Sequence, residues 1–394
     1  MPENLTNKML ENALRIFESK MTKPQYKAIK TIVKWIWKQS TTVLAKLHEH
    51  EIMHTKKFTE KISYHLGNVE LLSVVQKKSV MCATKVAEIA MQEGKPVIIS
   101  VDESDIFKPD ANCMPWLSMI RDGSTGLIGN GYIFRGVNIN GVSLISELDE
   151  EKAEKKGKVN ISKTIKLIEE TERLIGKDIK GTYVLDRGWD SIELIDYLLE
   201  KDHTFIIRMR KNRKVIDVKS WEKKKISDFV PGLHVVDIEW DTRVVLCVAK
   251  RKWFREPILL ITNDVGLDES AIVSSYLKRW KIEEDFNKMK SLGLEEVRVL
   301  SLYKIKNLMA IIQFIIVLSQ DIFNEVMNRN GTTYEHIYLY YKKYATWKSL
   351  TLNPSSFIRF VSENLLAYSW YNSASEPDYW LFSSKVCRKK LGIL

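Results

Sequence analysis

The stretch PVIISVDES, residues 96–104, decides how this chain folds. It begins with a short run of apolar, mostly β-branched residues and ends in acids. This pattern is typical of a buried strand with a polar tip. Residues 1–94 have almost no strand pattern, so the predicted secondary structure changes from helix to strand at Pro96. Asp102 stands at the polar end of this predicted strand.

The residues that follow alternate between strand and helix patterns. A hairpin is predicted in GYIFRGVNINGVSLISEL (131–148), where Asn140-Gly141 supplies the turn. Next come an amphipathic helix (162–175), a second buried strand ending at Asp186 (GTYVLDRGWDS, 181–191), another helix (191–201) and the strand HTFIIRMR (203–210). The order predicts an α/β fold in which helices pack on a mixed sheet. The segment 211–262 contains only strand-like pieces and is interpreted as a β-rich insertion.

Helical segments flank this α/β region on both sides. Residues 1–94 carry fifteen Lys and Arg against nine Glu and no Asp, and we interpret them as a basic helical DNA-binding domain. The α/β core is expected over 95–210 and again over 263–330, with the insertion between. The helical tail 331–394 is a candidate dimerisation region. The apolar run at 308–318 is about half the length that spans a bilayer, so a buried core helix is expected there.

The overall charge points to an anionic partner. The chain of 394 residues has 61 Lys and Arg against 50 Asp and Glu, a net charge of +11. Nucleic acid is the commonest such partner for a large soluble chain, although a basic protein need not bind a polyanion. The N-terminus has no signal-peptide pattern, and the four cysteines form no CxxC pair. A cytoplasmic protein without a membrane segment is therefore predicted.

A charged helix is predicted at YLKRWKIEEDFNKMK (276–290), and its three consecutive acids are not equivalent. At 100° per residue from Tyr276, Arg279 falls at about −60°, Glu283 at about −20° and Lys290 at about −40°. Glu284 falls at about +80° and Asp285 at about 180°, away from this polar stripe. Glu283 is thus the acid beside two cations and a phenol. An ordinary surface Arg–Glu pair would produce the same stripe.

The two strand-end acids favour a chemical role. Carboxylates at the ends of buried strands are costly unless their charge is used or paired. Asp102 and Asp186, joined by Glu283 from the helix, would make an oxygen-rich pocket suited to two Mg²⁺ ions, with Mn²⁺ as a possible substitute. Two ions about 3.5–4 Å apart are the arrangement that in-line attack on a phosphodiester requires.

The spacing Tyr276-(2)-Arg279-(3)-Glu283-(6)-Lys290 resembles the YREK signature of a large branch of bacterial insertion-sequence transposases. VDESDIFKP resembles the first-aspartate motif of that family and DRGWDS the second, with Trp189 where Tyr or Phe is usual. The resemblance spans roughly residues 95–325, with its motifs in the family order. It implies a ribonuclease H-like core, a catalytic and metal-binding triad of Asp102, Asp186 and Glu283, and a β-rich insertion before the glutamate.

The resemblance also implies partners and further roles. Such transposases act as dimers on the inverted-repeat ends of their element, cut with Mg²⁺ through hairpin ends and join the ends to target DNA. Double-stranded DNA and a homodimer are therefore the expected partners. A tryptophan of the insertion would hold a flipped base; Trp221, Trp240 and Trp253 are available, with Trp240 and Trp253 favoured, although core packing is the commoner role for any single one of them. The remaining expected DNA contacts are Tyr276, Arg279, Lys290, Arg187, Arg208, Arg210, Lys211 and Arg213, where a solvated charge run is the alternative.

Three alternatives stay open. HEIMH (50–54) matches the HExxH motif of zinc proteases, although its Lys-rich helical context argues against that function. A ribonuclease H-like nuclease or resolvase would share the three acids. A DNA-binding derivative that has lost catalysis would share the fold, although all three acids are intact.

Overall fold

The computed structural model describes residues 2–49, 56–123, 125–149, 160–239, 242–251, 256–328 and 332–363. The chain forms two compact units. The first comprises Met1–Lys78, Asn112–Pro115 and Asn287–Leu394, and the second comprises Ser79–Ala111 and Trp116–Phe286. The candidate triad belongs to the second unit.

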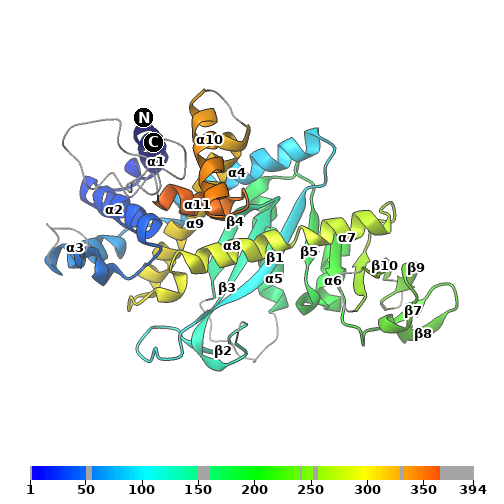
Figure 1. The fold of residues 1–394 in the computed structure, drawn as a ribbon. Coiled ribbons are helices and arrows are strands. Elements are labelled where there is room, and N and C mark those ends of the chain that lie inside the picture. Colours follow the sequence, from blue (N-terminus) through cyan, green and yellow to red (C-terminus); the bar gives the residue numbers. More distant parts are fainter. Residues whose placement is uncertain are drawn as a thin grey trace. The chain divides into compact units, whose positions relative to one another are not determined.

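The second unit is built on one mixed sheet of eleven strands (Figure 1). Its order is β2-β3-β1-β5-β6-β11-β10-β9-β7-β8, with β4 also paired to β3. The bounds are β1 Ile98–Phe107, β2 Ser118–Arg121, β3 Ile128–Ile139, β4 Val142–Leu148, β5 Thr182–Leu185, β6 Thr204–Arg208, β7 Lys214–Asp217, β8 Glu222–Lys225, β9 Gly232–Asp237, β10 Arg243–Ala249 and β11 Ile258–Thr262.

Five of these strands have the ribonuclease H-like arrangement. β1 pairs antiparallel with β3, which pairs antiparallel with β4, while β5 and β6 run parallel to β1 on its other side. The predicted turn between β3 and β4 is confirmed, since Asn140 and Gly141 have φ of 48° and 97°, as a tight hairpin turn requires. The predicted α/β fold class with a mixed sheet is confirmed.

The strands of the segment 211–262 continue this sheet. β11 pairs antiparallel with β6, and β10, β9, β7 and β8 follow outward in antiparallel pairs. The sequence predicted strands in this segment, and the structure adds that these strands extend the sheet of the core. Trp240 and Trp253 lie outside the described residues.

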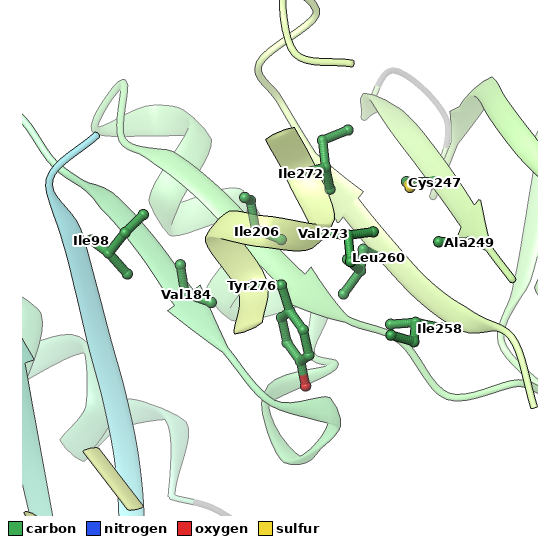
Figure 2. Packing of buried hydrophobic residues seen from close by; sticks show 10 residues of the cluster. All are labelled: Ile98, Val184, Ile206, Cys247, Ala249, Ile258, Leu260, Ile272, Val273 and Tyr276. Atoms are coloured by element: carbon green, nitrogen blue, oxygen red, sulfur yellow. The ribbon is translucent and has the colours of Figure 1, made fainter. Parts of the chain in front are cut away.

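Helix α7 (Glu269–Leu277) packs on one face of this sheet. Figure 2 shows the apolar cluster beneath it, formed by Ile98, Val184, Ile206, Cys247, Ala249, Ile258, Leu260, Ile272, Val273 and Tyr276. Val184 faces α7, so its neighbour Tyr183 points to the opposite face, where its ring lies 5.2 Å from that of His203. Helices α5 (Ile161–Ile175) and α6 (Ile192–Glu200) are the crossovers that parallel pairing requires.

The first unit is helical in its described part. It contains α1 (Pro2–Glu18), α2 (Lys23–Gln39), η1 (Leu44–Glu49), α3 (Lys56–Leu66), η4 (Leu294–Glu296), α9 (Leu302–Asn328), α10 (Thr332–Trp347) and α11 (Pro354–Val361). Two helices, α4 (Leu72–Gln92) and α8 (Trp280–Ser291), contribute residues to both units.

Helix α9 is the core of this unit. Its length and composition would suffice to cross a membrane, but 78% of its most apolar window is buried inside the protein. Phe314 on α9 packs edge-on against Phe17 of α1, with ring centroids 5.0 Å apart. The prediction of a buried core helix at 308–318 agrees with this packing. The motif HEIMH (50–54) and residues 364–394 lie outside the described residues, and the domain boundaries and roles given above remain predictions.

Candidate active site

Asp102 and Asp186 occupy matching positions on neighbouring parallel strands. Ile98 of β1 aligns with Thr182 of β5, and Ser100 aligns with Val184. The same register, continued by two residues, places Asp102 opposite Asp186. Side chains at matching positions of parallel strands point to the same face of the sheet. The prediction that Asp102 ends its strand is wrong, because β1 continues to Phe107, whereas Asp186 directly follows the end of β5 at Leu185. The two acids are nevertheless close enough for the charge of Asp186 to raise the pKa of Asp102.

Strand alternation separates Asp102 from its neighbour Glu103. Glu103 points to the opposite face of β1, where it accepts a hydrogen bond from Arg135 Nε at 2.7 Å. Arg135 is buried and also binds Asp149 at 3.0 Å. Glu103 thus belongs to a structural ion-pair network, which leaves Asp102 as the acid directed toward Asp186.

The chain from Tyr276 to Glu283 is two helices and not the single helix expected for 276–290. α7 ends at Leu277 and α8 begins at Trp280. Between them the amides of Arg279 and Ile282 donate to the carbonyls three residues earlier, at 3.0 Å each, so this turn is tightened to three residues. Tyr276 and Arg279 are one such turn apart, and Glu283 follows one α-helical turn later. Tyr276, Arg279 and Glu283 therefore still lie on one side, despite the break between α7 and α8.

Arg279 connects two of the three candidate acids. Its Nη1 donates to Asp102 Oδ2 at 2.5 Å, and its Nη2 donates to Glu283 Oε1. The guanidinium is only 5% exposed, whereas the Glu283 side chain is 31% exposed. Arg279 Nε is buried and has no hydrogen-bond partner among the described residues. One cation thus binds both Asp102 of β1 and Glu283 of α8.

Tyr276 connects the third acid. Its hydroxyl donates to Asp186 Oδ1 at 3.1 Å, and Arg208 Nη1 lies 3.8 Å from the same oxygen. Figure 2 shows the Tyr276 ring in the apolar cluster, with its hydroxyl pointing away from the other apolar side chains. Burial, with the charge of Asp186, raises the pKa of Tyr276 to about 12. The hydroxyl therefore keeps its proton and acts as a donor near neutral pH.

Asp102 lies in a strongly perturbed environment. Burial raises the pKa of Asp102 to about 7, and the charges of Asp186 and Glu283 add to this effect, although Arg279 opposes it. For Arg279, burial alone would lower the pKa, but the surrounding acids raise it overall. Arg279 therefore stays charged, but its single charge compensates the three carboxylates incompletely.

The three consecutive acids of α8 have three different environments. Glu283 binds Arg279, whereas Glu284 is exposed and pairs only with Lys281 at 3.0 Å. Asp285 is buried and accepts a hydrogen bond from Asn138 of β3. Asp285 thus anchors α8 to the sheet, and Glu284 faces solvent. The helical phase separated Glu283 from both.

Phe286 seats α8 on the sheet one turn after Glu283. Its ring packs edge-on against Phe134, with centroids 4.9 Å apart, and lies over Gly136. Gly136 is aligned with Asp102 in the β1–β3 pairing. A Cβ at Gly136 would lie 2.7 Å from Phe286 Cε1, closer than packing tolerates. The absence of a side chain at Gly136 thus sets the height of the helix that carries Glu283.

This contact predicts a defect in Gly136→Ala. The new methyl group should displace Phe286 and cost about 1–3 kcal/mol of unfolding free energy, as overpacked cores do. Urea denaturation checks this, with Gly123→Ala as the control because its Cβ would meet nothing closer than 3.4 Å. Equal stability of the two variants would contradict the proposed fit of α8.

Basic residues line a pocket beside Asp186. The pocket has a volume of about 540 Å³. Its walls include Asp186, Arg187, Arg208, Arg210, Lys211 and Asn212. Four of the cations expected to contact DNA therefore lie next to a candidate catalytic acid. Such a pocket suits a phosphodiester group.

The remaining expected contacts differ in their surroundings. Arg213 is held by Asp190, with Nε donating to Oδ1 at 2.8 Å, and Asp190 Oδ2 also accepts from the Arg210 amide at 3.0 Å. Asp190 therefore binds two residues of the loop between β6 and β7, a role that its sequence context does not indicate. Lys290 belongs to the first unit and pairs with Glu295 at 3.0 Å. Trp189 is buried and donates to Thr164 at 3.1 Å, a structural contact.

The donor set agrees with a hard divalent cation. Asp102, Asp186 and Glu283 offer only carboxylate oxygens, the ligands that Mg²⁺ and Mn²⁺ prefer. Burial, with the charges of Asp186 and Glu283, raises the pKa of Asp102, so a bound cation would stabilise its charged form. Among the described residues no group of three or more acids, histidines or cysteines is already arranged to hold a metal ion. The Arg279 guanidinium lies against two of the carboxylates, and its contact would have to change when a metal binds.

Comparisons with known proteins include one match that covers two of the three candidate acids. No curated protein matches the chain. A solved structure of the piggyBac transposase, a synaptic complex with hairpin DNA, is similar with a TM-score of 0.46 and 10% identity over 93% of this chain and 79% of that chain. The family model described as "Transposase DDE domain" matches residues 153–318. This segment contains Asp186 and Glu283 and begins after Asp102, so the chain contains a region similar to the DDE domain of transposases.

Proposed function

We propose that this protein is a metal-dependent DDE transposase of the YREK type, encoded by an insertion sequence. The observation that carries the proposal is the convergence of Asp102, Asp186 and Glu283 through Arg279 and Tyr276. The ribonuclease H-like strand order, the match to the transposase DDE domain and the net charge of +11 support it. A cytoplasmic location is part of the proposal.

In this proposal the three carboxylates hold two Mg²⁺ ions, which supply charge stabilisation for phosphoryl transfer. Tyr276 orients Asp186 by donating a hydrogen bond from its hydroxyl to the carboxylate. Arg279 holds Asp102 and Glu283 together without DNA. Its guanidinium would bind a phosphate oxygen only after it leaves these acids. Arg208, Arg210 and Lys211 in the pocket beside Asp186 bind the DNA backbone.

The proposed substrate is the DNA at the ends of the element. A homodimer binds the terminal inverted repeats, cuts them through hairpin ends and joins the 3′ ends to target DNA. Trp240 and Trp253, from the insertion, remain the proposed holders of a flipped base. Incubating the purified protein with DNA that carries both ends and Mg²⁺ tests this proposal. Nicked, hairpin and strand-transfer products support it, whereas the complete absence of metal-dependent cleavage would contradict it.

The same experiment, together with a measurement of zinc content, separates the alternative functions. A ribonuclease H-like nuclease or resolvase would cut DNA but would not join the 3′ ends to a target. A zinc protease would contain stoichiometric zinc that is lost in His50→Ala. A catalytically inactive DNA-binding derivative would bind the ends and leave them intact.

The perturbed pKa of Asp102 predicts a pH-dependent metal affinity. Because a ligand carboxylate must lose its proton, protons compete with the metal below the raised pKa of about 7. Affinity for Mn²⁺, measured by calorimetry without DNA, should therefore increase from about pH 6 to about pH 8. Asp102→Asn should bind Mn²⁺ more weakly and lose this dependence. An affinity that is flat over this range in the wild-type protein would contradict the role of Asp102 as a ligand.

A further inference from the structure

The β7–β8 hairpin forms one end of the sheet. β8 is the last strand in the order, and among the described residues it pairs only with β7. Residues 210–225, which include this hairpin, contain eight basic residues and two acids. The segment directly follows Arg208, which lines the pocket beside Asp186. A strongly positive edge thus begins a few residues from the candidate active site.

The lysines of this hairpin gather on one face. Lys214 is aligned with Lys225, and Ile216 is aligned with Lys223, so the three lysines share the face defined by strand alternation. All three are exposed, and so is Lys219 in the turn. None of the four forms an ion pair with a described residue. Like charges directly opposite each other destabilise a strand pair, so an anionic partner would relieve this arrangement.

Other basic side chains of residues 210–225 already bind carboxylates. Lys224, on the opposite face, binds Asp217 at 2.6 Å and lies over the ring of Phe229. Arg213 is bound by Asp190. Basic residues that stabilise the fold therefore have carboxylate partners, whereas Lys214, Lys223 and Lys225 have none among the described residues. This difference argues against a role in stability for Lys214, Lys223 and Lys225.

Trp221 projects from the turn of this hairpin. Its side chain is 67% exposed, and its φ is 58°, a left-handed value that is unusual for a bulky residue. The turn is built to hold this conformation, because the Trp221 amide donates to the Asp217 carbonyl at 2.7 Å and the Lys219 amide donates to Asp217 Oδ1 at 3.1 Å. Strained, exposed residues that their surroundings maintain are found at binding sites.

We propose that the β7–β8 hairpin is a DNA-binding wing in which Lys214, Lys223 and Lys225 contact phosphates and Trp221 packs against a nucleotide. Unneutralised cations beside an exposed aromatic ring are the combination that nucleic acids bind. Duplex DNA is the partner because the wing continues, along the chain, from the basic pocket beside Asp186. The inference rests on the proposed function, to which it adds a contact outside the triad.

Salt dependence of DNA binding tests the wing. Affinity for a fluorescein-labelled duplex of mixed sequence is measured in EDTA over a range of NaCl concentrations. For Lys223→Gln/Lys225→Gln the slope of log affinity against log salt should become shallower by about 1.8, because each lost phosphate contact removes about 0.9. The matched control is Lys177→Gln/Lys180→Gln, which removes two exposed lysines near the end of α5 and should keep the wild-type slope.

Trp221 gives an independent readout. Trp221→Ala should weaken binding about 5-fold or more without changing the slope, because a ring contact releases no counterions. Trp221→Phe should retain most of the affinity. As the ring is exposed, thermal unfolding of Trp221→Ala should match that of the wild type.

The outcomes separate this inference from the proposed function. An unchanged slope in Lys223→Gln/Lys225→Gln with normal cleavage would overturn the wing alone. Loss of binding to phosphatidylserine vesicles in that variant, with DNA binding intact, would overturn it in favour of a membrane partner. A changed slope in a protein that never cleaves DNA would support the wing and overturn the proposed function.

Discussion

Replacing Glu283 with Ala should abolish metal-dependent cleavage of the element's ends, whereas replacing Glu284 should leave most of it. Glu283 shares Arg279 with Asp102, while Glu284 is exposed and binds only Lys281. Loss of a carboxylate that holds a metal removes the charge stabilisation of the transferred phosphoryl group, and we expect a fall in rate of at least about 10²–10³-fold, as for other preorganised electrostatic groups. Asp102→Ala and Asp186→Ala should behave like Glu283→Ala.

The adjacent acids make the experiment selective. Glu284→Ala removes the same chemical group from the next position of the same helix, so both variants lose one charge from α8. DNA binding by all variants, measured in EDTA, should stay detectable, so that loss of cleavage is not loss of binding. Full activity in any of the three triad variants, or equal loss in Glu284→Ala, would contradict the assignment.

Much of this site follows from local patterns. Asp102 and Asp186 each follow a short apolar run, and these two runs pair in parallel, with Ser100 aligned with Val184. The apolar run did not indicate that β1 continues past Asp102 to Phe107. Glu283 was separated from Glu284 and Asp285 by helical phase alone. Similarly, Asn140-Gly141 predicted the hairpin because few residue pairs adopt left-handed conformations so readily.

The rest depends on contacts between distant segments. The break between α7 and α8 has no Gly or Pro to mark it, since it comes from a turn tightened to three residues. The continuation of the core sheet by β11 depends on its pairing with β6, about fifty residues earlier. Asp190 looks like one more exposed acid in the sequence, yet it binds Arg213 across 23 residues. Short-range patterns carry no information on such partners.

Arg279 should prove to be both a stabilising residue and a competitor of the metal. Arg279→Ala leaves Asp102 and Glu283 facing each other without their shared cation, and breaking a buried pair in this way costs about 3–5 kcal/mol. Protonation of Asp102, whose pKa is already about 7, limits the cost near neutral pH, so the loss should be largest at higher pH. Urea denaturation in EDTA at about pH 8 measures it.

Addition of Mn²⁺ distinguishes this role from simple packing. A divalent cation among the carboxylates replaces the missing guanidinium charge, and a ligand that binds only the folded state stabilises it in proportion to its occupancy. Arg279→Ala should therefore recover part of its stability in Mn²⁺ and should bind Mn²⁺ more tightly than the wild-type protein without DNA. Arg279→Lys keeps a charge but cannot donate to both acids in the geometry of a guanidinium, so it should be intermediate.

The control for Arg279→Ala is Arg173→Ala, which removes an exposed arginine paired with Glu170 in the same unit and should change neither stability nor Mn²⁺ affinity. If Arg279→Ala lost the same stability with and without Mn²⁺, the carboxylates would not be binding the metal, and Arg279 would be only a structural ion-pair partner. If instead Mn²⁺ restored stability and bound more tightly, Arg279 would hold the acids together in the free protein at the expense of metal affinity. Arg279 would then have to leave the acids as metal binds.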